Sequence, residues 1–216
     1  MSNQRYAHIF ASITKWSSEN NIDKNKINPA LFKFIFTPKH QMDDAIRSLQ
    51  AQDIEGAMYC LESQNRMAFV SDNLSPLIAY GFYEKALFNA YIGTVTNLKY
   101  WKLRDLRFMF NLADKDTLYG LGDNFDKEYP LTVYRGICGG GNAYRPRGLS
   151  WTTDLEQAKW FATFPQQRYG KKFNNIHVYK TQVSREKIYF CTNGREENEV
   201  VCNITPKHKI ELVWSE

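Results

Sequence analysis

The spacing of apolar residues changes character about halfway along this chain of 216 residues. In the first half, apolar positions largely recur at the intervals of a helix, which predicts helices with one buried face. One such face comprises Leu77, Ile78, Phe82, Ala86, Leu87, Ala90 and Tyr91. Thr37-Pro38 and Ser75-Pro76 each predict an N-cap followed by a proline at the first helical position. The first half is therefore predicted to be mainly helical.

A further helix is predicted between Leu98 and Phe110. Its apolar residues leave Lys102, Arg104 and Arg107 on the other sides of the helix, which we interpret as a solvated basic face. The Gly-, Asp- and Asn-rich stretch at 120–128 then predicts the end of the helical part of the chain.

After this stretch, apolar residues come in short segments separated by turn residues, a pattern typical of strands. One helix interrupts them, and it is predicted to begin at Thr153 because Thr153 and Glu156 have the spacing of a capping box. The predicted strands span Leu131–Arg135, Leu149–Thr152, Ile176–Val183, Ile188–Cys191, Glu199–Ile204 and Ile210–Trp214. We therefore expect an α+β protein in which a helical N-terminal lobe at 1–125 packs on a strand-rich core at 126–216.

The composition is that of a folded, globular protein, since 43% of the residues are hydrophobic and 15% are aromatic. The formal net charge is +5, and most of the basic excess falls in residues 126–216. Such an excess suits a dinucleotide or another polyanionic ligand and is compatible with a nucleic acid partner. A solvated surface with scattered lysines explains it equally well.

The cysteines and the N-terminus bear on the compartment in which the protein works. None of the cysteines has Cys-x-x-Cys spacing, so we interpret them as free thiols in a reducing compartment and expect no metal site. They are Cys60, Cys138, Cys191 and Cys202. The N-terminal residues lack the apolar core of a signal peptide, and no apolar run approaches the length of a membrane span. We expect a cytoplasmic protein, or one delivered into a target cell without a signal peptide, and no membrane partner.

Three short motifs stand at predicted strand ends in the second half. They are Tyr-Arg-Gly at 134–136, Ser-Trp-Thr-Thr at 150–153 and Glu-Asn-Glu at 197–199. Residues i and i+2 of a strand point to one face, so Glu197 and Glu199 can converge on one ligand. Keeping both carboxylates ionised costs free energy unless a cationic or hydroxyl-rich group lies in front of them. The motifs therefore predict a ligand site, and the alternative is an acidic strand edge that prevents aggregation.

In this order the three motifs resemble the Arg-Ser-Glu, cholera-toxin-like class of the ADP-ribosyltransferase superfamily, over residues 130–214. The diphtheria-toxin-like branch would have a histidine where this chain has Arg135, and the histidines of the chain lie in none of the motifs. The resemblance implies a core of two small antiparallel or mixed sheets. It also implies a mono-ADP-ribosyltransferase, an enzyme that moves ADP-ribose from NAD to a macromolecule and releases nicotinamide.

The resemblance assigns roles to the two glutamates. Cleavage of the nicotinamide bond develops positive charge on the ribose, so a fixed carboxylate stabilises the transition state more than the ground state. Glu199 matches the catalytic acid that bonds the ribose 2′-hydroxyl. Glu197 matches the residue that orients and deprotonates the acceptor. A glutamate there resembles the arginine-modifying pattern, because a carboxylate can pair with a guanidinium through two hydrogen bonds.

The other motif residues match the NAD-binding part of the family's site. Arg135 matches the arginine that anchors the phosphate and ribose oxygens of NAD, and with Ser150 and the two glutamates it completes the implied catalytic set. Gly136 matches the position whose backbone bonds the nicotinamide carboxamide. Ser150, Trp151 and Thr152 match the strand wall of the pocket, where the two hydroxyls support the catalytic glutamate.

The segment at 163–175 matches the family's loop over NAD, in which an aromatic residue packs on nicotinamide and a basic residue reaches the phosphates. Phe164 and Arg168 are the candidates for these two roles, and a flexible solvated loop is the alternative. Gly139, Gly140 and Gly141 are interpreted as a hairpin tip, because no helix start follows them as a dinucleotide-binding fingerprint requires.

The acceptor stays open at this stage. The segment at 192–196, which presents the acceptor in this family, has no aromatic residue at its tip and carries Arg195 and Glu196 instead. A protein arginine is the first expectation, DNA or RNA is the second, and water is the third, which would make the protein an NAD glycohydrolase. A non-catalytic binding protein on the same fold is a further alternative. By analogy we expect a bacterial or phage toxin or effector, for which an antitoxin or inhibitor protein would be a partner.

Overall fold

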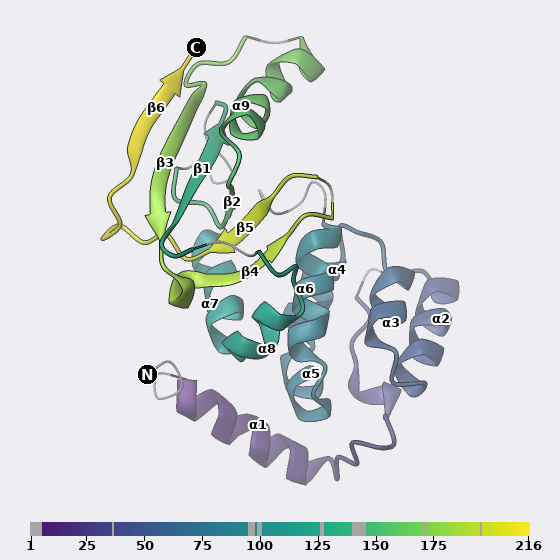
Figure 1. Ribbon diagram of the computed structural model, residues 1–216. Coiled ribbons are helices and arrows are strands. Elements are labelled where there is room, and N and C mark those ends of the chain that lie inside the picture. Colours follow the sequence, from purple (N-terminus) through teal and green to yellow (C-terminus); the bar gives the residue numbers. More distant parts are fainter. Residues whose placement is uncertain are drawn as a thin grey trace. The chain divides into compact units, whose positions relative to one another are not determined.

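The first part of the chain is helical, and the second part contains six strands and a long helix (Figure 1). The computed structural model describes residues 6–35, 37–94, 98, 101–125, 128–139, 146–170, 172–194 and 196–216. The protein is α+β, as predicted. It forms two compact units, Met1–Leu98 with Phe108–Asp114 and Lys99–Arg107 with Lys115–Glu216. The second unit thus takes in residues before 126, since α8 (Lys115–Gly120) groups with the strands.

The first unit is built from short helices around a buried apolar core that includes Leu77 and Leu87. Its helices are α1 (Ala7–Glu19), α2 (Lys39–Gln50), α3 (Ile54–Cys60), α4 (Arg66–Asp72), α5 (Leu74–Tyr80), α6 (Tyr83–Gly93) and the C-terminal part of α7 (Leu103–Leu112), with a 3-10 turn at Pro29–Leu31. The buried Asn73 side chain donates to the carbonyls of Lys33 at 2.9 Å and Phe69 at 2.8 Å and accepts from the Lys33 N–H at 2.6 Å. This amide is fully hydrogen-bonded, as burial of a polar group requires.

Two helices of this unit start differently from their predicted caps. α2 begins at Lys39 after an extended Pro38, so the proline precedes the helix and does not occupy its first position. α5 begins at Leu74, so Ser75 and Pro76 lie inside its first turn. A proline is tolerated there because the first N–H groups of a helix have no intrahelical partner.

The second unit is built on one antiparallel sheet with the strand order β4-β5-β2-β1-β3-β6. Each strand coincides with a predicted one within a few residues. The strands are β1 (Leu131–Ile137), β2 (Ser150–Thr152), β3 (His177–Val183), β4 (Ile188–Thr192), β5 (Glu199–Cys202) and β6 (Glu211–Ser215). A 3-10 turn at Arg185–Lys187 leads into β4.

In the described residues, the strands β1 to β6 pair in one sheet, where the family resemblance implied two. The join between β1 and β2 is narrow. Within the described residues it consists of the single pair Tyr134 and Thr152, which we call the seam. By contrast, β1 pairs with β3 from Leu131 to Ile137. Because neighbouring strands twist relative to one another, two twisted halves, β4-β5-β2 and β1-β3-β6, stay in register only over this short stretch.

Helix α9 (Leu155–Tyr169) connects β2 to β3 and lies against β1 and β3 (Figure 1). Its N-cap is Asp154, where the sequence predicted Thr153. The Asp154 carboxylate accepts from the backbone N–H groups of Glu156 at 2.7 Å and Gln157 at 3.2 Å. A carboxylate suits this position because it both caps the helix and interacts favourably with the positive end of the helix dipole.

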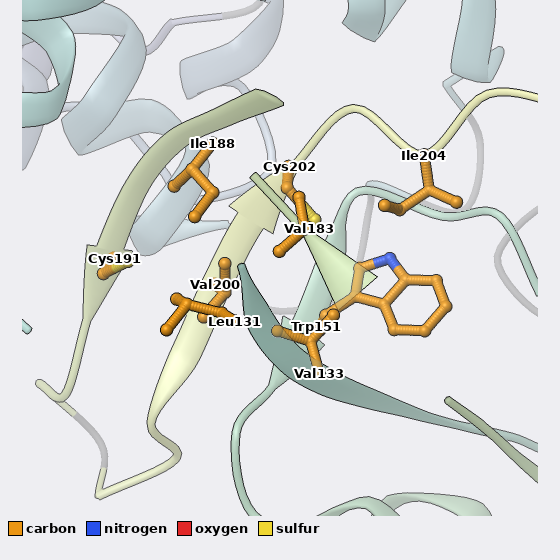
Figure 2. Packing of buried hydrophobic residues seen from close by; sticks show 9 residues of the cluster. All are labelled: Leu131, Val133, Trp151, Val183, Ile188, Cys191, Val200, Cys202 and Ile204. Atoms are coloured by element: carbon orange, nitrogen blue, oxygen red, sulfur yellow. The ribbon is translucent and has the colours of Figure 1, made fainter. Parts of the chain in front are cut away.

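Two apolar clusters fix the strands of the second unit. The cluster in Figure 2 joins β1 to β5 and consists of Leu131, Val133, Trp151, Val183, Ile188, Cys191, Val200, Cys202 and Ile204. The Trp151 indole N–H is satisfied inside it by the carbonyl of Gly148 at 2.9 Å. The second cluster joins α9 to the sheet and consists of Cys138, Ala158, Ala162, Ile176 and Val178. The motif residues Arg135, Ser150, Thr152 and Glu199 are therefore carried on packed strands.

The four cysteines, all of which lie in the described residues, form no disulfide, and three of them are buried: Cys138, Cys191 and Cys202. In the described part of the chain, no helix combines the length and the hydropathy that a membrane crossing needs.

Candidate functional site

Arg135 lies where β1 and β2 diverge. Beyond the seam, no further register pair joins these two strands in the described residues. The guanidinium of Arg135 spans the gap instead, and its Nη1 donates to the backbone carbonyl of Ser150. Where the backbone pairing of β1 and β2 ends, the side chain of Arg135 therefore hydrogen-bonds β2 in its place. This bond links the first motif to the second.

The segment in front of β2 leaves room for this guanidinium. Gly148 is buried, and a Cβ added to it would lie only 2.8 Å from Nε of Arg135. Real Cβ atoms essentially never approach a neighbour this closely. A side chain at position 148 would therefore displace Arg135.

Arg107, on α7, holds the same segment. Its Nη2 donates to the carbonyls of Arg147 at 3.0 Å and Ile204 at 2.5 Å. Burial lowers the pKa of Arg107, and the positive charge of Arg147 acts in the same direction. The basic face predicted to be solvated is thus half-buried at Arg107, which braces the residues that lead to Ser150.

Ser150, Thr152 and Glu199 share one face of the ladder between β2 and β5. Thr152 is directly opposite Glu199, and Ser150 is opposite Val201. Cross-strand partners place their side chains on the same face, and so do residues two apart on one strand. Ser150 and Glu199 are half-buried, whereas Thr152 is 3% exposed. The second and third motifs therefore meet as direct neighbours.

The hydroxyl of Thr152 is bonded to the backbone around the third motif. Its Oγ1 donates to the carbonyl of Glu197 at 2.7 Å and accepts from the N–H of Asp154 at 3.1 Å. The N–H of Thr153 donates to the carbonyl of Asn198 at 3.2 Å. Thr152 therefore positions the Glu-Asn-Glu motif through its backbone.

Arg135 and Glu199 act electrostatically on one buried group, the thiol of Cys202. Burial is the main cause that raises the pKa of this thiol. Arg135 lowers the same pKa and Glu199 raises it, so both charges lie within reach of Cys202.

Gly136 and Trp151 have structural neighbours that the sequence did not reveal. A Cβ at Gly136 would lie 2.7 Å from the backbone nitrogen of Ala162 and 3.0 Å from the carbonyl carbon of Ala158, both in α9. The glycine therefore lets α9 approach β1. The indole of Trp151 is 2% exposed within the core, which leaves only its backbone for contact with a ligand.

Phe164 and Arg168 lie in α9, which continues to Tyr169, and so they do not belong to a loop. The ring of Phe164 stacks on that of Trp160, with centroids 4.5 Å apart and an interplanar angle of 27°. The Arg168 guanidinium carbon lies 5.8 Å from the ring centroids of both Phe164 and Tyr169. Trp160 is 43% exposed and Tyr169 is 62% exposed. We call these four residues the α9 aromatic stripe.

Asp123 and Asn193 support the third motif and were missed in the sequence. The carboxylate of Asp123 accepts from the N–H of Asn193 at 2.5 Å, and the N–H of Asp123 donates to the carbonyl of Cys191 at 2.8 Å. Asn193 and Gly194 form a turn dipeptide that marks the hairpin. No sequence signal separates Asp123 from other surface acids.

Three residues considered in the sequence, Gly140, Gly141 and Arg195, lie outside the residues that the structure describes. Among the described residues, no group of three or more His, Cys, Asp or Glu side chains could hold a metal ion.

Comparison with known proteins gives no match: neither a protein-family model, nor a curated protein, nor a solved structure is similar to the chain.

Proposed function

We propose that this protein is a mono-ADP-ribosyltransferase that cleaves NAD and transfers ADP-ribose to a macromolecular acceptor, in the first place a protein arginine. The three motifs lie on the adjacent strands β1, β2 and β5 or directly at their ends. Arg135 bonds the backbone of Ser150, and Glu199 faces Thr152 on the next strand. Residues from distant parts of the chain thus come together on neighbouring strands, which supports a shared site.

The residues present fit NAD as a substrate. The half-buried guanidinium of Arg135 suits phosphate and ribose oxygens, which accept from its planar set of donors. During cleavage, the bond between ribose C1′ and the nicotinamide nitrogen breaks, and its electron pair leaves with neutral nicotinamide. Glu199 stabilises the positive charge that develops on the ribose. An acceptor nitrogen then bonds C1′, and its proton passes to the carboxylate of Glu197.

The decisive test is the rate of nicotinamide release from NAD by the Glu199→Gln variant. Removing the charge while keeping the shape is expected to lower this rate by at least about 100-fold. Glu211→Gln is the matched control, because Glu211 lies on the edge strand β6 and pairs with Lys180 at 3.3 Å. A Glu199→Gln variant that works at the wild-type rate would contradict the proposal. Absence of NAD binding by calorimetry at millimolar NAD would favour a non-catalytic binding protein.

A nucleic acid is the second candidate acceptor, and the α9 aromatic stripe favours it. Exposed aromatic rings interleaved with an arginine are the surface on which single-stranded bases stack. Incubation of a cell lysate with the protein and biotinylated NAD separates the alternatives. Label removed by protease identifies a protein acceptor, and label removed by nuclease identifies DNA or RNA. NAD cleavage without label on either identifies an NAD glycohydrolase.

The toxin or effector role, the cytoplasmic or delivered location and the antitoxin or inhibitor partner stay predictions of the family resemblance. Expression in a bacterial host tests the toxin or effector role. Growth arrest by the wild-type protein and normal growth with Glu199→Gln would link toxicity to NAD chemistry.

A further inference from the structure

Asn193 anchors the backbone on both sides of Glu197, in the described residues between β4 and β5. Its backbone carbonyl accepts from the N–H of Glu196 at 2.8 Å. Its side-chain oxygen accepts from the N–H of Asn198 at 3.1 Å. Its own N–H donates to the carboxylate of Asp123 at 2.5 Å. Hydrogen bonds to Asn193 therefore hold Glu196 and Asn198, the two residues that flank Glu197.

Asp123 reaches this loop from outside the hairpin, along β4, which is an edge strand of the sheet. The N–H of Asp123 donates to the carbonyl of Cys191 at 2.8 Å. A Cβ on the preceding Gly122 would lie 3.1 Å from the nitrogen of Cys191 and 3.1 Å from Cβ of Phe190, so the glycine permits the close approach. The backbone of Asp123 is therefore bonded to β4, and this contact fixes the position from which its carboxylate reaches Asn193.

The loop needs such anchors because its backbone is strained on both sides of Glu197. Glu196 has a φ of 59° and Asn198 has a φ of 46°, both in the left-handed region that side chains disfavour. Glu199 is held differently, since it pairs with Thr152 on one side and with Thr192 on the other. Loss of the anchors would therefore loosen the residues on both sides of Glu197, whose carbonyl would still be held by Thr152, and would leave Glu199 in its ladder.

We propose that Asp123 and Asn193 are positioning residues that hold Glu197 toward the acceptor and so couple NAD cleavage to transfer. This role rests on the proposed function. Nicotinamide release depends on the charge of Glu199, whereas capture of the ribose by the acceptor depends on the place of Glu197. The Asp123–Asn193 contact thus decides whether ADP-ribose goes to a macromolecule or to water.

The test compares two rates for each variant: nicotinamide release from NAD, and labelling of lysate macromolecules with biotinylated NAD. Asp123→Ala removes the charge-assisted hydrogen bond to the N–H of Asn193 and is expected to lower labelling by about tenfold. Asn193→Ala keeps that backbone N–H and loses only the neutral bond from the N–H of Asn198, so labelling is expected to fall by about fivefold. Nicotinamide release is expected to stay within about twofold of wild type in both variants. Asp123→Asn keeps an acceptor oxygen and is expected to restore most of the labelling. Asp116→Ala removes a carboxylate that is 98% exposed in the same unit and controls for charge.

Hydrogen exchange adds a readout that does not depend on activity. In Asp123→Ala the backbone N–H groups of Asn193 and Asn198 are expected to exchange faster than in wild type, and Asp123→Asn is expected to slow them again. Equal loss of both rates, loss of neither, or unchanged exchange would overturn the positioning role while the proposed function stands. A wild-type protein that releases no nicotinamide would instead overturn the proposed function, and the positioning role with it.

Discussion

The guanidinium of Arg135 lies against the α-carbon of Gly148, in a space that a side chain at 148 would need. Gly148→Ala would push aside the end of a flexible side chain, so we expect the free energy of unfolding to fall by no more than about 1 kcal/mol. NAD cleavage is expected to fall about tenfold, because Arg135 would leave its place. Urea denaturation and nicotinamide release measure the two effects. Gly120→Ala is the control, since a Cβ there meets nothing within 4 Å. Wild-type activity in Gly148→Ala would show that NAD does not need Arg135 at this position.

Gly136→Ala is expected to act on stability, in contrast to Gly148→Ala. The added Cβ would meet backbone atoms of Ala158 and Ala162, which can move only if α9 shifts from β1. We expect the free energy of unfolding to fall by about 2–3 kcal/mol, measured by urea denaturation. A variant as stable as wild type would mean that α9 can move away at little cost.

Thr152→Val tests whether the end of β2 holds the third motif. Valine has the shape of threonine but loses the bonds to the carbonyl of Glu197 and the N–H of Asp154. Leaving these backbone groups unpaired is expected to lower the free energy of unfolding by about 1–3 kcal/mol. Thr152→Ser keeps the hydroxyl and is expected to lose less. If Thr152→Val proved more stable than Thr152→Ser, the hydrogen bonds of the Thr152 hydroxyl would contribute nothing to stability.

Glu197→Gln is expected to separate transfer from cleavage. If the acceptor is an arginine, loss of the carboxylate removes both the partner of the guanidinium and the proton acceptor. Labelling of protein should then fall by about 100-fold, while nicotinamide release continues. Mass spectrometry of labelled lysate and chromatography of nicotinamide measure the two rates. Unchanged labelling would argue against an arginine acceptor and favour a nucleic acid.

Tyr83 is expected to make the first unit sensitive to alkali. Its buried hydroxyl donates to the carbonyl of Met109 at 2.9 Å, and burial raises the pKa of Tyr83 above its ordinary value of 10.0. As pH rises, the phenol of Tyr83 ionises in the unfolded chain before it ionises in the folded protein. Its contribution to the free energy of unfolding is therefore complete below the pKa of the unfolded chain and is lost as pH rises toward the pKa of the folded protein. Between about pH 9 and 11, wild type should lose about 1 kcal/mol more stability than Tyr83→Phe. Equal losses in urea denaturation would contradict this.

The sequence located the strands and α9 because each has a local signal, either a short apolar segment between turns or a cap before an apolar face. The N-cap shifted by one residue because Thr153 and Asp154 are both good caps and only the fold selects between them. The extension of α9 past Ala162 was not predicted, and Pro165, a residue that commonly ends a helix, lies inside it.

Contacts between distant residues had no such signal. Arg107 looked solvated because its partners are backbone carbonyls at Arg147 and Ile204, far along the chain. The closeness of Gly148 to Arg135 was equally hidden, since it depends on where β1 and β2 part. The motif strands proved to be neighbours, whereas the chemistry assigned to them awaits the experiments above.

In the described residues, the register pair of Tyr134 and Thr152 is the backbone connection between the two halves of the sheet, β4-β5-β2 and β1-β3-β6. An insertion or a bulge in the hairpin of β4 and β5 would therefore have little effect on the pairing of β1 with β3, because only this one pair connects the two halves in the described residues. Each half can therefore vary in length and loop sequence during evolution without forcing a compensating change in the other.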